Sequence, residues 1–202
     1  ANGCSSTDAV IVTVNALPTI SAGADQAICS GATATLTASG AGTNGTYLWN
    51  DANASTTATL SVSPTATTTY TVTGTDANGC SSTDAVIVTV NALPIAVIVS
   101  SDLDAEICQG ETVTFYSTGA QSYEFFVNST SQGVQNSNVG TFSTSSLNNA
   151  DVVYVKTTGS NGCFANSDSI AFTVNALPNT SVTSSGSLSF CSGSSVTLTA
   201  AS

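Results

Sequence analysis

The sequence predicts an all-β protein made of tandem antiparallel β-sandwiches, and three observations support this prediction. Two sequence motifs recur in alternation along the chain. Short segments in which apolar residues alternate with threonine or serine lie between turn signals, as in strands with one buried face. Only 6% of the residues are charged while 41% are hydrophobic, so Thr and Ser are the main polar residues and the chain has the apolar content of a folded protein.

Two sequence motifs are repeated along the chain. The segment ANGCSSTDAVIVTVNALP at 1–18 recurs unchanged at 77–94, and a diverged copy occupies 161–178. A second motif, with Cys-x-Gly at its start, occurs three times: ICSGATATLTA at 28–38, ICQGETVTFYS at 107–117 and FCSGSSVTLTA at 190–200. The NALP tags recur at intervals of about 76 and 84 residues, a period that fits one small, independently folding domain per repeat.

This periodicity predicts the domain organisation. Residues 1–14 correspond to the last strand of a preceding repeat, and residues 177–202 to the first strands of a following one. Two complete repeats lie between them, at 15–92 and 93–176. Proline in the NALP tags cannot donate a ladder hydrogen bond, which suits a domain boundary.

Within a repeat, the alternation predicts about seven short strands. In the second motif, Leu36, Phe115 and Leu198 occupy the same inward-facing position. Asn78-Gly79 predicts a type I′ hairpin turn before the last strand, because both residues tolerate positive φ. Seven short strands in about 80 residues are typical of an immunoglobulin-like or fibronectin-like sandwich, and a closed barrel is the less favoured alternative.

Each complete repeat holds one cysteine near its start and one before its last strand. A small core with few aromatic residues needs a disulfide bond to stabilise it. Disulfides in turn indicate an oxidising compartment. The favoured pairing joins the two cysteines of one repeat and leaves the outer two to partners outside the segment: Cys29 with Cys80, Cys108 with Cys163, and Cys4 and Cys191 paired elsewhere.

A second connectivity uses all six cysteines inside the segment. It is disfavoured because each bridge would have to span a last strand of about ten residues, or roughly 33 Å. This alternative pairs neighbours in the sequence: Cys4 with Cys29, Cys80 with Cys108, and Cys163 with Cys191. A structural zinc site is weaker still, because the chain has no CxxC motif and no histidine.

Charge and composition exclude several function classes. Lys156 is the sole basic residue, and the net charge is −11. Such a chain repels nucleic acid and anionic membrane surfaces, so neither is an expected partner. There is no apolar run long enough for membrane insertion. Without histidine, no nucleophilic triad of the Ser-His-Asp kind forms, and the scattered acids do not suggest paired carboxylate catalysis. We expect no enzyme activity and no cofactor.

Candidate metal and ligand contacts are few. If their segment is extended, Asp102, Asp104 and Glu106 lie on one face and form a weak candidate Ca²⁺ site; the plainer interpretation is a charged edge that discourages strand pairing, so no metal is expected. Trp49 is interpreted as a core residue and not as a sugar platform, and Phe126 has outward parity and is the better contact candidate.

Two further surface features concern covalent modification. Val153 and Val155 take the inward parity, so Lys156 should face solvent and not form an isopeptide bond. Asp168-Ser169-Ile170 matches a short bacterial O-glycosylation signature, which makes Ser169 a weak glycosylation candidate. Sequons such as Asn128-Ser129-Thr130 occur often by chance in a chain so rich in Thr and Ser.

The motifs carry a family resemblance over the whole chain. The series GADQAICSGATATLTASG, TYLWN and TATLSVSPTATTTYTVTGTDANGCSSTDAVIVTVN resembles the Ig-like, PKD-like repeats of giant surface adhesins in the Bacteroidetes. The second repeat resembles a sister type in the same proteins. The resemblance implies cell-surface display on adhesins, including SprB-like gliding-motility adhesins, which the type 9 secretion system exports.

Three functions are consistent with these features. The first is a structural spacer in the stalk of a long surface adhesin or extracellular filament, with neighbouring repeats held semi-rigidly by Pro-bearing linkers and running end to end. The second is a module that binds surface glycans or another cell. The third is a subunit that self-associates with other copies into a fibre. Near-identical repeats favour the spacer, because a dedicated binding site needs distinct loops.

Overall fold

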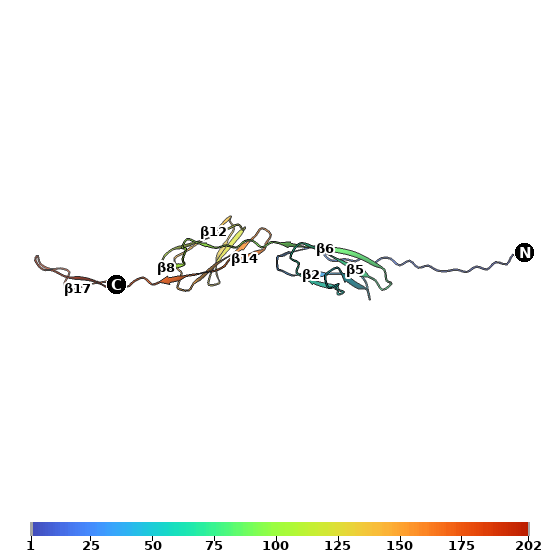
Figure 1. Cartoon of the computed structure of the whole chain (residues 1–202), viewed down its shortest axis with the longest axis horizontal. Coiled ribbons are helices and arrows are strands. Elements are labelled where there is room, and N and C mark those ends of the chain that lie inside the picture. Colours follow the sequence, from blue (N-terminus) through green and yellow to red (C-terminus); the bar gives the residue numbers. More distant parts are fainter. Residues whose placement is uncertain (1, 202) are drawn as a thin grey trace. The chain divides into compact units, whose positions relative to one another are not determined.

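The computed structural model describes residues 2–201, and in that range it contains β-strands and no helix (Figure 1). No helix in this range is long and apolar enough to cross a membrane. The chain divides into two compact units, Ala1–Leu93 and Pro94–Ser202. Each unit contains one β-sandwich with its own buried core, so the expected fold class of tandem sandwiches is confirmed.

The first sandwich contains six strands in two sheets. The larger sheet has the order β1-β6-β5-β3, and the smaller pairs β2 with β4. All neighbours are antiparallel except β1 and β6, which run parallel. The strands are β1 (Gln26–Cys29), β2 (Ala34–Thr37), β3 (Thr46–Trp49), β4 (Thr59–Val62), β5 (Thr68–Thr75) and β6 (Ser81–Asn91).

Alternation along these strands builds the core of the first unit. In β2, Ala34 and Leu36 are buried while the intervening threonines are exposed. Trp49 in β3 is 1% exposed, and its indole N–H donates to the carbonyl of Thr57 at 3.0 Å, so its polar atom is satisfied inside the sandwich. Gly74 in β5 leaves room for Ile20 to pack over the strand, because a Cβ there would overlap the Ile20 side chain.

The second sandwich has more strands, because it gains a hairpin and splits its last strand. One sheet has the order β11-β10-β13-β14 with β15 also on β13, a second has the order β12-β9-β7, and β16 pairs with β8 in parallel. The strands are β7 (Val99–Ser100), β8 (Glu106–Cys108), β9 (Val113–Thr118), β10 (Ser122–Val127), β11 (Thr130–Gln135), β12 (Val139–Thr144), β13 (Val152–Thr158), β14 (Phe164–Asn166), β15 (Ile170–Ala171) and β16 (Thr173–Asn175).

Aromatic residues fill the core of the second unit. Phe115, at the position of Leu36 in the first unit, is fully buried, with its ring edge-on to Phe172 at 5.7 Å between centroids. Phe142 stacks on both Phe115 and Phe125 at 5.9 Å. Edge-on and offset arrangements add favourable quadrupole interactions to the buried area. The second core therefore uses large rings where the first uses aliphatic side chains around one tryptophan.

The hairpin before the last strand differs from the expected type I′ turn. Gly79 has a positive φ of 82°, but Asn78 does not, and the Asp76 N–H donates to the Cys80 carbonyl at 2.9 Å. A three-residue loop with glycine in the left-handed position results, and the Asp76 carboxylate accepts the Cys80 N–H at 2.8 Å. The type I′ prediction was wrong because the aspartate side chain favours the longer loop.

The chain enters and leaves the first sandwich at opposite ends. The entry is marked by Pro18, whose carbonyl accepts a hydrogen bond from the Ser82 hydroxyl at 2.8 Å, near the start of β6. The exit follows Asn91, the last residue of β6. About nine residues of extended strand separate these two points, which corresponds to roughly 30 Å.

The second sandwich follows the same plan. Val99 in β7 pairs with Tyr116, close to the end of β9, so the chain enters there. Thr158, at the end of β13, pairs with Ser122 at the start of β10 and lies at this same end. The chain leaves through β16, where Asn175 pairs with Cys108 at the other end of the unit.

The two terminal segments contribute little to either core. Residues 2–19 contain no strand, and their apolar side chains are exposed up to Leu17, among them Ile11 at 91%. Near the other terminus, β17 (Ser181–Ser184) and β18 (Leu198–Ala201) form an antiparallel hairpin. The repeat boundaries expected from the sequence stay a prediction.

Candidate functional site

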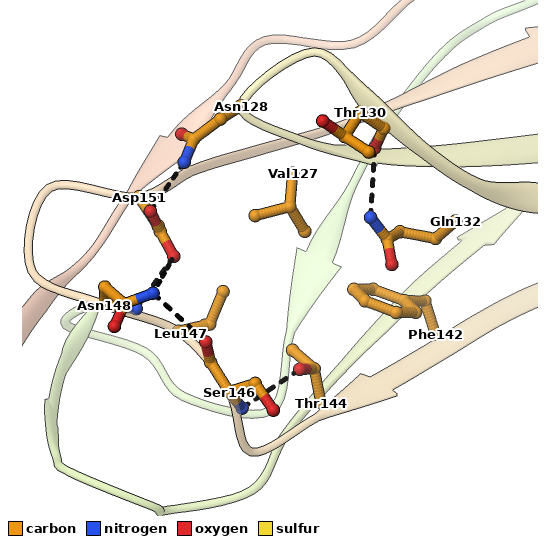
Figure 2. A pocket seen from close by; sticks show the side chains of 10 residues that line it. All are labelled: Val127, Asn128, Thr130, Gln132, Phe142, Thr144, Ser146, Leu147, Asn148 and Asp151. Carbon is orange, nitrogen blue, oxygen red and sulfur yellow. Dashed lines mark hydrogen bonds between the residues drawn. The ribbon is translucent and has the colours of Figure 1, made fainter.

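A pocket of about 320 Å³ opens in the second unit where β10 and β12 end (Figure 2). Val127, Leu147 and Phe142 supply apolar surface, and the rest of the lining is hydroxyl, amide and carboxylate. The polar lining residues are Asn128, Thr130, Gln132, Thr144, Ser146, Asn148 and Asp151. The residues come from β10–β11 on one side and from the β12–β13 connection on the other.

Asp151 organises the polar side of this pocket. The side chain is buried, with 8% of the residue exposed. One carboxylate oxygen accepts the Asn128 side-chain N–H at 2.6 Å, and the other accepts the Asn148 backbone N–H at 2.7 Å. Figure 2 shows both amide side chains turned toward this carboxylate. The loop is closed by Ala150, which has a left-handed φ of 70°.

Hydrogen bonds to Asp151 hold its pKa below the usual value of 3.8, with the Asn148 N–H as the largest cause, opposed by burial. The carboxylate is therefore ionised at neutral pH and accepts hydrogen bonds from its neighbours. A group in this state is a poor general acid. The arrangement makes Asp151 a fixed loop anchor, and the polar lining outside its network, such as Thr130 and Gln132, is what could contact a polar ligand.

The first unit uses a related anchor at the corresponding place. Asn50 follows β3, and its side chain accepts the Thr71 N–H at 2.8 Å, just as Asn128 after β10 accepts the Val152 N–H at 3.0 Å. Asp51 accepts the Ser55 N–H at 2.8 Å, which is the largest cause of its lowered pKa. These asparagines fasten the end of one strand to the strand beside it.

The outward aromatic and charged residues lie on one face of the second unit. Phe126 stacks on Tyr154 with centroids 4.8 Å apart, so it is a half-buried surface residue that already has an aromatic partner. Lys156 has the outward parity expected from buried Val153 and Val155. Its ammonium lies 3.5 Å from Glu124 and 5.0 Å from the Phe164 ring centroid, so the side chain covers protein surface while its head meets solvent.

Of the three residues in the acidic cluster, Glu106 begins β8, while Asp102 and Asp104 do not lie on a strand. Residues 101–105 form bends, and Ala105 has a positive φ of 57°, so the extended geometry was wrong. Asp102 accepts the Ala105 N–H at 2.7 Å, and Asp104 accepts the Glu106 N–H at 3.2 Å. The carboxylates stabilise their own loop. Across residues 2–201, no group of three His, Cys, Asp or Glu side chains is placed to hold a metal ion.

The cysteine positions contradict the pairing within each repeat. Cys80 and Cys108 are free thiols, as are Cys4 and Cys191. Cys29 pairs in register with Asn91, at the far end of β6 from Cys80, so the two cysteines of the first unit are separated by roughly 36 Å of strand. The sequence argument failed because it took both cysteines to lie at one level of the sandwich. Neither Cys29 nor Cys163 is a free thiol.

The modification candidates differ in their availability. Ser169 is exposed in the segment between β14 and β15, so its hydroxyl is accessible. Asn128, which begins a sequon, uses its side chain to hold Asp151 and Val152, so attaching a sugar would break the loop anchor. The sequence reasoning missed the pocket itself. The Asn- and Asp-rich run from Asn148 to Asp151 was the available signal for a tight, hydrogen-bonded turn.

Comparison with protein families found a match to the first sandwich. Residues 16–94 match the family described as Ig-like domain CHU_C associated. The first unit therefore resembles an Ig-like domain over this range. The buried Trp49 on its third strand occupies the place expected for the core tryptophan of this fold. No curated protein matches the chain.

Several solved structures align with most of the chain at low identity. The fibronectin(III)-like modules of CbhA from Clostridium thermocellum align with 79% of this chain and 95% of theirs, at 12% identity and a TM-score of 0.41. Titin domains I67–I69 align with 81% of this chain and 67% of theirs, at 14% identity and 0.41. A 1.5-MDa bacterial ice-binding adhesin aligns over 81% and 67%, at 15% identity and 0.34.

Proposed function

We propose that these Ig-like units are non-catalytic spacer repeats in the stalk of a cell-surface adhesin. One observation carries the proposal: in each unit the chain enters at one end of the sandwich and leaves at the other. A unit built this way adds its own length to the reach of the chain. A domain whose two termini lie side by side would add little to the length that the chain spans.

The construction of each unit supports this role. Each sandwich closes around its own core, so neither needs the other to bury apolar surface. Disulfide-bonded cysteines support an extracellular or surface location. The same proposal extends to the parent protein, for which we infer a Bacteroidetes surface adhesin exported by the type 9 secretion system. Its immediate partners are then the neighbouring repeats of the same chain.

A distance measurement tests the spacer. Cys80 lies at the entry end of the first unit and Cys108 at the exit end of the second, and both are free thiols suitable for spin labels. With Cys4 and Cys191 changed to Ser, we expect a Cys80–Cys108 distance of roughly 65–80 Å by pulsed electron resonance, from two sandwich lengths and a linker. A distance below about 40 Å would mean that the units fold back on one another, and the spacer would be abandoned.

The pocket of the second unit supports glycan binding as a second candidate function. Its polar side chains around the half-buried Phe142 suit the hydroxyls and apolar ring carbons of a sugar. A glycan array with the wild-type chain, and with Gln132→Ala, tests it directly. Gln132 lines the pocket but lies outside the Asp151 network, so its loss should remove binding without unfolding the loop. An array without wild-type binding would reject this function.

A further inference from the structure

We propose that the outer face of the five-stranded sheet in the second unit is a self-association surface, to which a second copy of this chain binds through the same face. The strands that present it are β11, β10, β13 and β14, in that order across the sheet. The inference goes beyond the spacer function, because a spacer works equally well with or without a partner at its side.

Aromatic side chains gather on this face around one ion pair. Phe126 and Tyr154 are register partners in β10 and β13, and their rings stack with centroids 4.8 Å apart. Two residues further along β13, Lys156 pairs with Glu124, and its ammonium lies 5.0 Å from the centroid of the Phe164 ring. Phe164 is 56% exposed. The face therefore presents aromatic rings on both sides of the ion pair.

The first unit lacks these rings at the corresponding positions. The registers align the two sheets, because Trp49 pairs with Val72 as Phe125 pairs with Val155. The aligned outer-face residues, with the second unit given first, are Phe126 with Asn50, Tyr154 with Thr71, Phe164 with Ser81, Lys156 with Thr73 and Glu124 with Leu48. The first sandwich folds without the rings and without the ion pair. The fold therefore does not require them, and a contact outside the unit accounts for their presence.

Charge complementarity selects the partner. The chain has a net charge of −11, and Lys156 is its one basic residue. Its ammonium lies 3.5 Å from the Glu124 carboxylate, so the centre of this face is neutral although the chain as a whole is strongly acidic. A second copy offers the same two charges, and turning it over brings each charge opposite its counterion. The face is thus complementary to itself, as a two-fold contact requires.

A two-fold axis parallel to the strands and midway between β10 and β13 generates the contact. Sheets that pack face to face lie about 10 Å apart, with their strands aligned within about 30°. About this axis, each β10 residue lies opposite its own register partner in β13 of the second copy. Glu124 then faces Lys156, and Phe126 faces Tyr154.

The two flanks of the face complete the contact. β14 is next to β13 and β11 is next to β10, so the axis places Phe164 of one copy over β11 of the other. Val134 in β11 is 59% exposed and lies on this face, since it pairs with Glu124. Four strands of about six residues cover roughly 20 Å by 20 Å. This area is smaller than a standard interface of about 800 Å² per partner, so we expect weak, reversible association.

Sedimentation of the full chain tests the surface. The free cysteines are first alkylated with iodoacetamide, so that no intermolecular disulfide forms. We expect the wild-type mass to rise from 20.0 kDa toward twice that value between about 10 μM and about 1 mM. Phe164→Ser should weaken the dimer about tenfold, while Leu48→Ser, at the Glu124 position of the first unit, should leave it unchanged. A monomeric wild type over this range, or equal losses in the two variants, would overturn the proposal.

Two charge-reversed variants test the two-fold geometry. Lys156→Glu brings Glu opposite Glu in its own dimer, and Glu124→Lys brings Lys opposite Lys, so each variant alone should stay monomeric. An equal mixture brings two Glu opposite two Lys and should form heterodimers. A surface ion pair contributes little to folding, so both variants should keep the wild-type circular dichroism spectrum. A mixture that associates no better than either variant alone would refute the two-fold contact.

Discussion

Two regions of this chain share one sequence and differ in structure. Residues 1–18 and 77–94 are identical, yet the second copy contains β6, while the described part of the first has no strand. Val88 in β6 is fully buried, whereas Val12, its counterpart in the first copy, is 80% exposed. The alternating pattern is therefore sufficient to predict a strand and insufficient to form one.

The difference shows what the strand requires. β6 is paired on one side with all eight residues of β5 and on the other with the four residues of β1. Its inward side chains contact a core built by residues from the whole unit, among them Leu36 and Trp49. Strand stability thus depends on pairing and burial that the local sequence cannot supply, which is why β-propensity depends so strongly on context.

The largest expected effect comes from placing a charge at the same position in each copy. Val88→Asp buries an unpaired carboxylate, so we expect a loss of about 4 kcal/mol or more and a melting temperature lower by about 15 °C or more. Val12→Asp should change the free energy of unfolding by less than about 0.5 kcal/mol. Fluorescence of Trp49, the one tryptophan, reports the melt of the first unit. Equal effects in the two variants would contradict the comparison.

A smaller effect should follow acidification. The N–H groups of Ala22 and Ala85 hold the pKa of Asp84 below its usual 3.8, so this stabilisation is present above about pH 4 and is lost as the pH falls through the folded pKa. Asp84→Asn should lower stability at pH 7 and flatten the acid limb of the stability curve. Asp8→Asn, at the same position of the first copy, should leave the curve unchanged. Denaturant titrations followed by Trp49 fluorescence between pH 2 and 7 measure both.

The smallest effect concerns thiol accessibility. Cys4 is exposed, while Cys80 is half-buried in the β5–β6 hairpin, where its N–H is held by Asp76. We expect iodoacetamide to modify Cys4 a few-fold faster than Cys80 in the native chain, and both at one rate in denaturant. Timed alkylation with mass spectrometry gives the two rates. Equal native rates would show that the hairpin opens freely.

The sequence allowed the fold to be predicted because burial alternates so regularly. The inward positions of β2, β9 and β13 were assigned correctly from parity, including Leu36, Phe115 and Val153. Internal repetition also exposed the motifs shared by successive sandwiches. These are local or periodic signals, and a single chain displays them directly.

The sites could not be predicted in the same way, because they depend on which segments meet. The parallel pairing of β1 with β6 places Cys29 at the exit end, and nothing near Cys29 in the sequence indicates this. The positive φ of Ala105 folds the acidic segment back on itself. Alanine rarely adopts a positive φ, so the sequence did not predict this turn. The pocket around Asp151 needs two separate loops, so it became visible only in three dimensions.

The parallel pair at the edge of each sandwich determines how a unit responds to force. A pull on the two ends draws β1 toward the entry and β6 toward the exit, so the strands would have to slide past one another. The hydrogen bonds between the paired residues, from Gln26–Val88 to Cys29–Asn91, then bear the force at the same time in shear and do not break one after another. In the second unit, β8 and β16 present the same geometry, with pairs from Glu106–Thr173 to Cys108–Asn175. Each domain is thus loaded along its most resistant direction when tension runs through the chain.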